Sequence, residues 1–335
     1  MQPLKTDWFL KQVPPKPMGR YAHIITLRVT DSYPLFQTDG ELNTARVSAG
    51  EANPEIMTRL TLFKRKQTTP ERLTGRELLR RYGFLSQDMA EGKKETGSDG
   101  LPIDDYNVQF YPQSPDSIAY GFAIGDSGSE KSKVITDTAY SLTTYADSHE
   151  AFTLNAPYED GTMTRREDVT SRINEQDHVQ PQVVFPAVVT SRDLTLNLFL
   201  YVLNNVVRTR RYGAQTTRTG KMQNYLVAVV LTDGEIFSNL KFTQRLYDVL
   251  KDQIEAERPN PISSTTAIMA ATGLVPSLLA EDYVNVDQLI VKEDIAQLLR
   301  GLKEITASEA EMKKLLGNAL ADSQAYHAAW VAKGK

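Results

Sequence analysis

The stretch from Arg208 to Gly220 carries the side chains best suited to contact with a nucleic acid. It reads Arg-Thr-Arg-Arg-Tyr-Gly-Ala-Gln-Thr-Thr-Arg-Thr-Gly and lies in the longest acid-free run of the chain, between Asp193 and Asp233. Guanidinium groups match phosphate oxygens, a tyrosine ring offers a face to a base, and glycine lets the main chain approach a ligand closely. The alternative is a solvated hairpin, because charge runs usually face water.

The distribution of charge supports a nucleic-acid partner although the formal net charge is −4. Residues 56–82 hold eight basic and two acidic side chains, and residues 194–232 hold five basic and none acidic. Residues 91–180 hold seven basic and seventeen acidic side chains. Two basic segments that met on one face of the fold would form an electrostatic track for a polyanion.

Composition excludes several other classes of protein. The chain has 335 residues, 41% of them hydrophobic, and no cysteine, which rules out disulfides, thiolate metal sites and a cysteine nucleophile. We find no signal peptide and no apolar run of the ~18 residues that a membrane span requires. These features predict a cytoplasmic protein without a membrane contact, a cofactor or a bound metal.

Few residues suggest catalysis. His23 and His178, the latter beside Asp177, are predicted to be structural, because no nucleophile accompanies them. Asp104 and Asp105 could touch a metal, but a solvated loop is the simpler reading. Asp39 is the weak catalytic candidate, although Gly40 after it indicates a turn.

Periodicity and capping signals predict the elements that would position these residues. Strands are expected at Tyr21–Thr30, Ser117–Gly125, Lys133–Leu142, Val183–Thr190 and Met222–Leu231. Helices are expected from Thr69, with Pro70 in the first turn, to Tyr82, from Asp193 to Arg208, from Ser238 to Glu257, and in the C-terminal region at Asp287–Glu304 and Ser308–Ala332.

This order of elements predicts an α+β fold with a ferredoxin-like (RRM-like) core. Residues 1–85 and 183–260, with parts of 117–142, would form an RRM-like palm. Residues 86–182 would be an insertion that includes a projecting thumb or finger, and residues 261–335 a helical C-terminal extension. Asp160-Gly161 is a hairpin signal within the insertion, with Arg165 and Arg166 just past its tip.

Three segments together resemble the type I-D CRISPR backbone protein of cyanobacteria, a member of the Cas-seven family in the RAMP superfamily. They are Leu42–Gly50, Ser171–Pro186 and Arg208–Gly220, and the resemblance extends from about Tyr21 to Gln244. The segment Ala45-Arg46-Val47-Ser48 is similar to the Arg-Ala-Arg-x-Ser-Ser pattern of the wider family. Thr44 stands where the first arginine of that pattern would be.

The resemblance implies a non-catalytic subunit that polymerises along the CRISPR guide RNA and supports recognition of target DNA, or RNA. It also implies further partners: other copies of this chain, a Cas-five type subunit, a Cas-ten-like large subunit and small Cascade subunits. A subunit that accepts any guide should contact phosphate, ribose and base faces rather than base edges. The residues predicted to contact RNA are Asn43, Thr44, Arg46, Ser48, Arg59, Lys64, Arg165, Arg166, Arg208, Arg210, Arg211, Tyr212, Gly213, Gln215, Thr216, Thr217, Arg218 and Lys221.

Two alternatives to this function are open. In the first, the backbone subunit also cleaves its bound target through an acidic loop residue, with Asp39 or Glu41 holding a metal ion. In the second, the chain is a stand-alone RNA-binding or structural protein.

Overall fold

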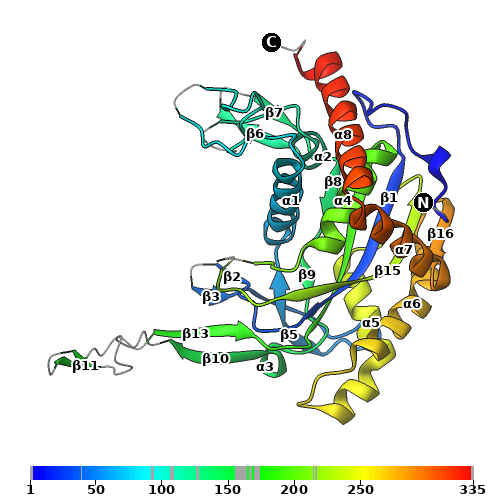
Figure 1. Ribbon diagram of the computed structural model, residues 1–335. Coiled ribbons are helices and arrows are strands. Elements are labelled where there is room, and N and C mark those ends of the chain that lie inside the picture. Colours follow the sequence, from blue (N-terminus) through cyan, green and yellow to red (C-terminus); the bar gives the residue numbers. More distant parts are fainter. Residues whose placement is uncertain are drawn as a thin grey trace.

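A five-stranded antiparallel sheet lies at the centre of the molecule (Figure 1). The computed structural model describes residues 3–38, 40–91, 94–105, 109–125, 128–154, 164–165, 168–169, 174–213, 215 and 217–332. The strand order in the sheet is β16 (Val286–Val291), β15 (Met222–Thr232), β1 (Tyr21–Thr30), β14 (Val184–Arg192) and β8 (Val134–Thr136). The predicted strands at Tyr21–Thr30, Val183–Thr190 and Met222–Leu231 are thus confirmed to within two residues at each end.

Helices cover both faces of this sheet. Because neither face meets water, β1 is buried at every position except Tyr21. Its apolar residues join the cores on both faces, and the buried set also includes the polar side chains of His23, Thr26 and Arg28. One face packs against α1 (Lys64–Arg81), α2 (Pro115–Tyr120), α4 (Leu196–Arg208), α7 (Glu293–Ala307) and α8 (Glu309–Tyr326). The other face packs against α5 (Asn239–Glu257) and α6 (Ser264–Glu281).

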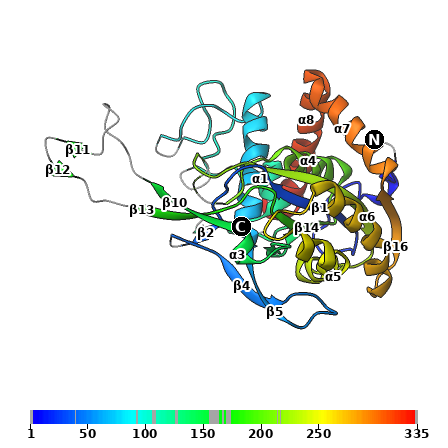
Figure 2. The ribbon, with the colours of Figure 1, turned by 90° about the horizontal axis from the view of Figure 1, so that it is seen from below.

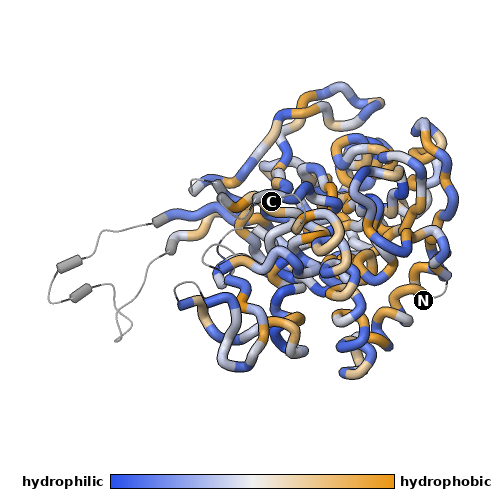
Figure 3. Tube along the Cα trace, turned by 90° about the horizontal axis from the view of Figure 1, so that it is seen from above, coloured by the Kyte–Doolittle hydropathy of each residue, from blue (hydrophilic) through white to orange (hydrophobic). Residues whose placement is uncertain are grey.

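Smaller antiparallel sheets extend from this body. The ribbon of β10 (His149–Leu154) and β13 (Asn174–Val179) projects outward in the place predicted for a thumb (Figures 1 and 2). Figure 3 draws one strand of this ribbon mostly in blue, as the polar residues from Glu175 to His178 in β13 require, whereas Val179 at the base of the ribbon is hydrophobic and buried. The remaining strands are β2 (Gln37–Thr38) with β3 (Glu41–Leu42), β4 (Thr44–Ser48) with β5 (Ile56–Leu62) and β9 (Ala139–Tyr140), β6 (Phe122–Ile124) with β7 (Gly128–Glu130), and β11 (Thr164–Arg165) with β12 (Asp168–Val169). The remaining helices are the short helix Thr6–Trp8, α3 (Tyr145–Ser148) and the π-helix His327–Val331.

Side-chain caps set several helix starts. Ser238 and Ser308 accept hydrogen bonds from Lys241 N and Glu311 N, as their sequence context predicts. The start of α4 differs from its prediction: Thr195 caps it. The carboxylate of Asp193 instead accepts hydrogen bonds from the main-chain amides of Met18 and Arg20.

Three other predictions were wrong in detail. The helix predicted from Thr69 begins at Lys64, so Pro70 lies inside α1. Ser117–Tyr120 belongs to α2, because Ser114 caps a helical turn there. Within the predicted helix Asp287–Glu304, the first residues form β16, which pairs with β15 at the edge of the central sheet. Among the described residues, no helix is long and apolar enough to cross a membrane.

Candidate nucleic-acid interface

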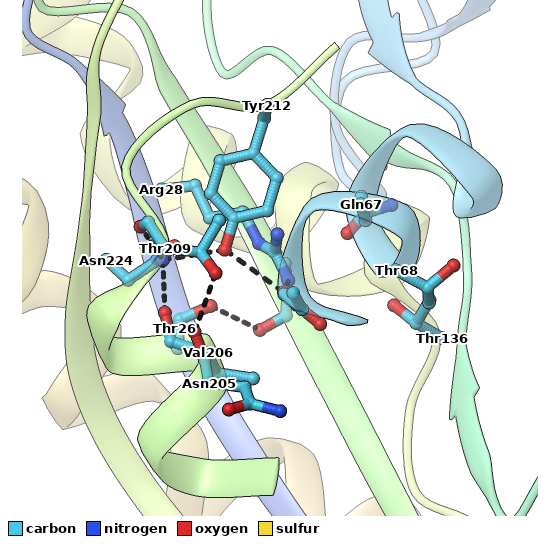
Figure 4. A network of polar contacts seen from close by, with 12 residues as sticks. Thr26, Arg28, Gln67, Thr68, Thr136, Asn205, Val206, Thr209, Tyr212 and Asn224 are labelled. Atoms are coloured by element: carbon cyan, nitrogen blue, oxygen red, sulfur yellow. Dashed lines mark hydrogen bonds and ion pairs between the residues drawn. The ribbon is translucent and has the colours of Figure 1, made fainter. Parts of the chain in front are cut away.

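The basic segment after α4 is held against the core by a buried polar network (Figure 4). Tyr212 Oη donates to Glu71 Oε1 at 3.0 Å and accepts from Asn224 Nδ2 at 2.8 Å. The Arg28 guanidinium forms a 3.0 Å ion pair with Glu71 and lies 4.6 Å from the centroid of the Tyr212 ring. The network therefore joins β1, α1 and β15 to the segment that follows α4.

Charges in this network are out of contact with water. The side chains of Arg28 and Glu71 are both 0% exposed. Burial raises the pKa of Glu71, and the positive charge of Arg28 opposes that rise. Removing either partner would leave an uncompensated charge in the core. Tyr212 was predicted to contact RNA, but its side chain is fully buried. It holds the basic segment in place from inside the core and cannot contact a bound nucleic acid.

Close backbone packing at Gly213 completes the attachment. Gly213 has φ of 93°, and a Cβ there would lie 2.2 Å from the carbonyl oxygen of Leu35. Its N–H donates to the carbonyl of Lys66 at 3.3 Å. Pro70 has no N–H with which to bond that carbonyl within α1, so the segment supplies a donor from outside the helix. The first turn of α1, with Lys64 and Lys66, is thereby placed beside the basic segment.

The residues Tyr33–Leu35 connect this segment to the projecting ribbon. Gly220 N donates to Tyr33 O at 3.0 Å, and Leu35 N donates to Thr219 Oγ1 at 3.0 Å. On the ribbon side, Val179 N donates to Pro34 O at 3.0 Å. The short stretch after β1 therefore lies between the basic segment and the base of the β10–β13 ribbon.

An open groove of about 320 Å³ lies where these parts meet. Its cationic side is formed by Arg211, Arg218 and Lys221, and all three residues are exposed. Its other side carries aromatic rings. Tyr33 and Phe152 meet edge to face at 4.9 Å, and Phe152 and His178 at 5.2 Å.

This arrangement can hold single-stranded nucleic acid. Cations on one wall suit phosphate oxygens, and aromatic rings on the other suit base faces. Sequence reasoning missed Tyr33 and Phe152, because a single aromatic residue near the end of a strand usually packs in the core. Tyr33 and Phe152 are far apart in the sequence, and they line one groove only because the fold places the ribbon beside the segment 210–221.

The structure places other predicted contacts elsewhere. Thr44, Arg46 and Ser48 alternate along one face of β4, where Thr44 and Arg46 are exposed, but none of them lines the groove. Asn43 Nδ2 donates to Phe36 O, which gives this side chain a structural role. Most of the Leu42–Gly50 segment forms β4.

Arg59 is a correction to the prediction. Its guanidinium is fully buried and donates to the main-chain carbonyls of Ser141, Leu142 and Ala49. Burial lowers the pKa of Arg59 to about 10. Its bonds hold β5 against the segment after β9, so Arg59 is a structural residue of the core.

The remaining predicted contacts fall into four groups. Arg210, Gln215 and Thr217 are exposed and lie within a few residues of the groove residues Arg211 and Arg218 in the sequence. The carbonyl of Gln215 accepts a hydrogen bond from Arg218 N and so closes the turn that carries Arg218. Arg208 lines a different depression, beside α7. Lys64 is exposed and pairs with Asp137 at 3.4 Å. The catalytic candidate Asp39, the predicted contacts Arg166 and Thr216, and the side chain of Arg165 lie outside the described residues.

Asp104 and His23, which were considered as candidates for metal binding or catalysis, have structural roles. Asp104 forms a buried ion pair with Arg76. His23 lies between the hydroxyls of Thr190 and Thr232, at 2.8 Å from each. His178 is the exception, since its ring borders the groove.

Comparison with known proteins gives the chain a family. The crystal structure of Thermofilum pendens Csc2 matches with a TM-score of 0.52 and 14% sequence identity, over 93% of this chain and 94% of that one. A chain of a structure described as "CRISPR RNA-guided surveillance complex, pre-nicking" matches with a TM-score of 0.47 and 11% identity, over 79% of this chain and 90% of that one. No curated protein matches the sequence. The model of the Csc2 CRISPR family matches residues 8–316, and the chain therefore belongs to the Csc2 family of CRISPR proteins.

Proposed function

We propose that the protein is a guide-RNA-binding backbone subunit of a type I-D CRISPR interference complex. Several copies would lie along one guide RNA in the cytoplasm and present it to target DNA. The partners would be the Cas-five type, Cas-ten-like large and small subunits that the sequence resemblance implies. Family membership supports this function, and so does the groove between the basic segment and the thumb.

The topology of the central sheet agrees with a palm of the ferredoxin-like type. Four of its strands have the order β15-β1-β14-β8, with α1 between β1 and β8 in sequence and α4 between β14 and β15. Numbered along the chain this is the order 4-1-3-2 of a βαββαβ unit, into which the thumb and the smaller sheets would be insertions. We interpret β16 as a fifth strand added by the C-terminal region.

The observation that carries the proposal is the pairing of three cations with aromatic rings across one groove. Arg211, Arg218 and Lys221 can neutralise phosphates of any sequence, while Tyr33 and Phe152 offer faces that accept any base. Base edges need not be read, as a subunit that serves many different guides requires. Both features predict sequence-independent binding of single-stranded RNA.

RNA binding by a charge-removal variant tests the function. The triple variant Arg211→Ala, Arg218→Ala, Lys221→Ala should bind RNA more weakly. The slope of log affinity against log salt should fall in magnitude by about 2, at ~0.7 for each phosphate that is no longer neutralised. A matched variant removes three exposed cations of α7 and α8 instead: Arg300→Ala, Lys313→Ala, Lys314→Ala. Equal affinities and equal slopes for the two variants would rule out the groove.

We also propose that the subunit does not catalyse a reaction. Cleavage of the target by an acidic loop residue is the competing function, with Asp39 as its candidate. Target cleavage assays with divalent metals separate the two. Regularly spaced cuts that disappear in Asp39→Ala would establish a nuclease, whereas an intact target supports a binding subunit.

A further inference from the structure

His178 adds a different chemistry to the cations and aromatic rings of the groove. The residue lies near the end of β13, at the base of the ribbon, and is only 9% exposed. Its ring packs edge to face against Phe152 at 5.2 Å and lines the groove together with Arg211 and Arg218. The imidazole is therefore held in place by packing and still borders the space that a ligand would fill.

The main chain determines which nitrogen of His178 carries the proton. Nδ1 lies 2.9 Å from the carbonyl oxygen of Gln176. Because a carbonyl oxygen can only accept, Nδ1 must be the donor, and in the neutral ring Nε2 is then an acceptor that has no proton to give. Within the described part of the chain, Nε2 has no hydrogen-bond partner and is not sealed off from solvent. The neutral ring thus offers the groove an acceptor without a partner.

Few groups of a nucleic-acid strand can bond to such an acceptor. Phosphate oxygens and the ring oxygen of the sugar are acceptors themselves. The donors are the 2′-hydroxyl of ribose and the N–H groups on base edges. Base edges vary with sequence, whereas the 2′-hydroxyl is present at every nucleotide of RNA and at none of DNA. The hydroxyls of Ser32 and Tyr33, which also line the groove, can donate or accept, so they do not require a donor in the ligand.

We propose that His178 makes the groove selective for ribose, with Nε2 accepting a hydrogen bond from a 2′-hydroxyl. The other groove residues do not supply this selectivity, because cations and ring faces bind the phosphates and bases of RNA and DNA alike. This inference rests on the proposed function, in which the guide is RNA and the target is DNA. A subunit that meets both kinds of strand needs a contact that only the guide can make.

Oligonucleotides that differ only at the 2′ position test this contact in the wild-type protein. A short single strand that binds one copy is prepared with 2′-hydroxyl or with 2′-fluoro sugars, and the 2′-fluoro strand keeps the sugar pucker of RNA but has no donor there. Titrations at pH 8 lie above the range in which a histidine ordinarily takes up a second proton. The 2′-hydroxyl strand should bind about two- to tenfold more tightly, the range for one net hydrogen bond. Equal affinities would overturn the proposal.

Replacement of the ring tests whether His178 is the source of the preference. His178→Phe keeps a ring beside Phe152 and removes both nitrogens, so the two strands should bind with equal affinity. His149→Phe is the matched control: this histidine lies on the same ribbon, its Nδ1 also donates to a main-chain carbonyl, that of Tyr145 at 2.8 Å, and it does not line the groove. The control should keep the wild-type preference. A His178→Phe variant that keeps this preference as well would refute the assignment.

A second substitution separates the acceptor from the packing of the ring. His178→Gln lacks the ring but carries an amide oxygen at a similar distance from the main chain. It should therefore retain more of the preference for the 2′-hydroxyl strand than His178→Phe does. Equal loss in the two variants would mean that His178 only supports the shape of the groove. The wild-type comparison needs no variant, so it decides the case even where a substituted chain does not fold.

Failure of this inference is distinguishable from failure of the proposed function. The triple variant that removes Arg211, Arg218 and Lys221 tests whether the groove binds RNA, and it should weaken the binding of both strands. Tight binding without a preference at the 2′ position removes the inference alone. A preference seen with an adenine homopolymer and absent with a uracil homopolymer would indicate a base edge and would also remove it. Absence of binding to every strand would overturn both.

Discussion

The side chain of Tyr212 could stack on an RNA base, but in this fold it is buried and holds the basic segment against the core. Its hydroxyl is a donor to Glu71 and an acceptor from Asn224. Burial raises its pKa well above the usual range of a tyrosine, so the hydroxyl keeps its proton and the bond to Glu71 persists at neutral pH. The basic segment therefore depends on a neutral phenol and a buried ion pair for its position.

Removing that hydroxyl is the first test. In Tyr212→Phe, Glu71 loses a donor and Asn224 loses an acceptor inside the core, which should lower the free energy of unfolding by about 1–3 kcal/mol. Tyr283→Phe removes the same atom from a fully exposed ring and should change nothing measurable. Urea unfolding of both variants makes the comparison. Equal stability of Tyr212→Phe and the wild type would show that this network does not hold the segment.

His23 predicts a pH dependence. Burial lowers the pKa of His23 from its usual value near 6.5 to about 4. Below pH 6.5 the unfolded chain takes up a proton that the folded chain refuses, so stability should fall as pH drops from 6.5 to 4. The decrease from this one group is about 3 kcal/mol at pH 4, from ~1.4 kcal/mol per pKa unit.

The measurement for His23 is urea unfolding at a series of pH values. His23→Gln keeps an amide between Thr190 and Thr232 but cannot take up this proton. The pH profile of the variant should therefore lack the decrease between 6.5 and 4. Parallel profiles for the variant and the wild type would contradict the assignment.

The sequence predicted which kinds of side chain could bind RNA, but it did not predict which of them are exposed and which are buried. The density of arginines in 208–220 pointed to the segment that borders the groove, and Arg211 and Arg218 do lie there. Arg59 and Tyr212 carry the same chemical groups and are buried. Their partners lie far away in sequence: Glu71 for Tyr212, and the carbonyls after β9 for Arg59. No local pattern distinguishes a guanidinium in water from one that is enclosed by carbonyls.

Among the elements, strands of the central sheet were the easiest to predict. β1 and β15 are long, β-branched and bounded by turn residues, so their local preference and their packing agree. α1 was harder, because Pro70 normally marks the first turn of a helix. Here a main-chain donor from Gly213 satisfies the carbonyl that Pro70 leaves open, and the helix continues back to Lys64.

Gly213 offers a test at this scale, with Gly40 as its matched control. The two glycines have nearly equal φ, 93° and 91°, so an alanine is strained at both. A Cβ at Gly213 would lie 2.2 Å from Leu35 O, whereas none of the described atoms lies within 4 Å of one at Gly40. Gly213→Ala should therefore cost about 1–3 kcal/mol more than Gly40→Ala, since overpacking adds to the strain.

RNA affinity should follow the same order in these two variants. Displacing Gly213 moves Arg211 and Arg218 relative to Tyr33 and so disturbs the groove. Calorimetric unfolding and a fluorescence RNA titration give both quantities from one preparation. A result in which the two alanine variants match in stability and affinity would contradict the tight packing of this segment.

In the whole molecule, the C-terminal region is part of the core. β16 forms an edge of the central sheet, and α7 and α8 pack with α4 on one of its faces. The sequence predicted helices there but gave no sign of where they pack. Apolar stripes on α7 and α8 specify that a face is buried and do not specify its partner. The strand was missed because Val286–Val291 is short and continues directly toward the next helix.

The attachment of α8 can be tested by shortening the chain. Met312, Leu315, Leu316 and Tyr326 are each at most 6% exposed, and Asp322 accepts hydrogen bonds from Thr195 and Asn197 at the start of α4. Burial of four such side chains is worth roughly 6–12 kcal/mol at ~1.5–3 kcal/mol each. A whole domain is stable by only ~5–15 kcal/mol. A chain that ends at Ala307 should therefore lose cooperative unfolding.

A chain that ends at Tyr326 is the matched control for this truncation. It keeps α8 and removes the half-exposed Trp330, so its melting temperature should stay within a few degrees of the wild type. Near-ultraviolet circular dichroism and calorimetry distinguish the two shortened chains. If the chain ending at Ala307 melts as sharply as the wild type, the C-terminal helices are an appendage. If it does not, the central sheet and the C-terminal region fold as one unit, and the depression between α4 and α7 is a fixed part of that unit.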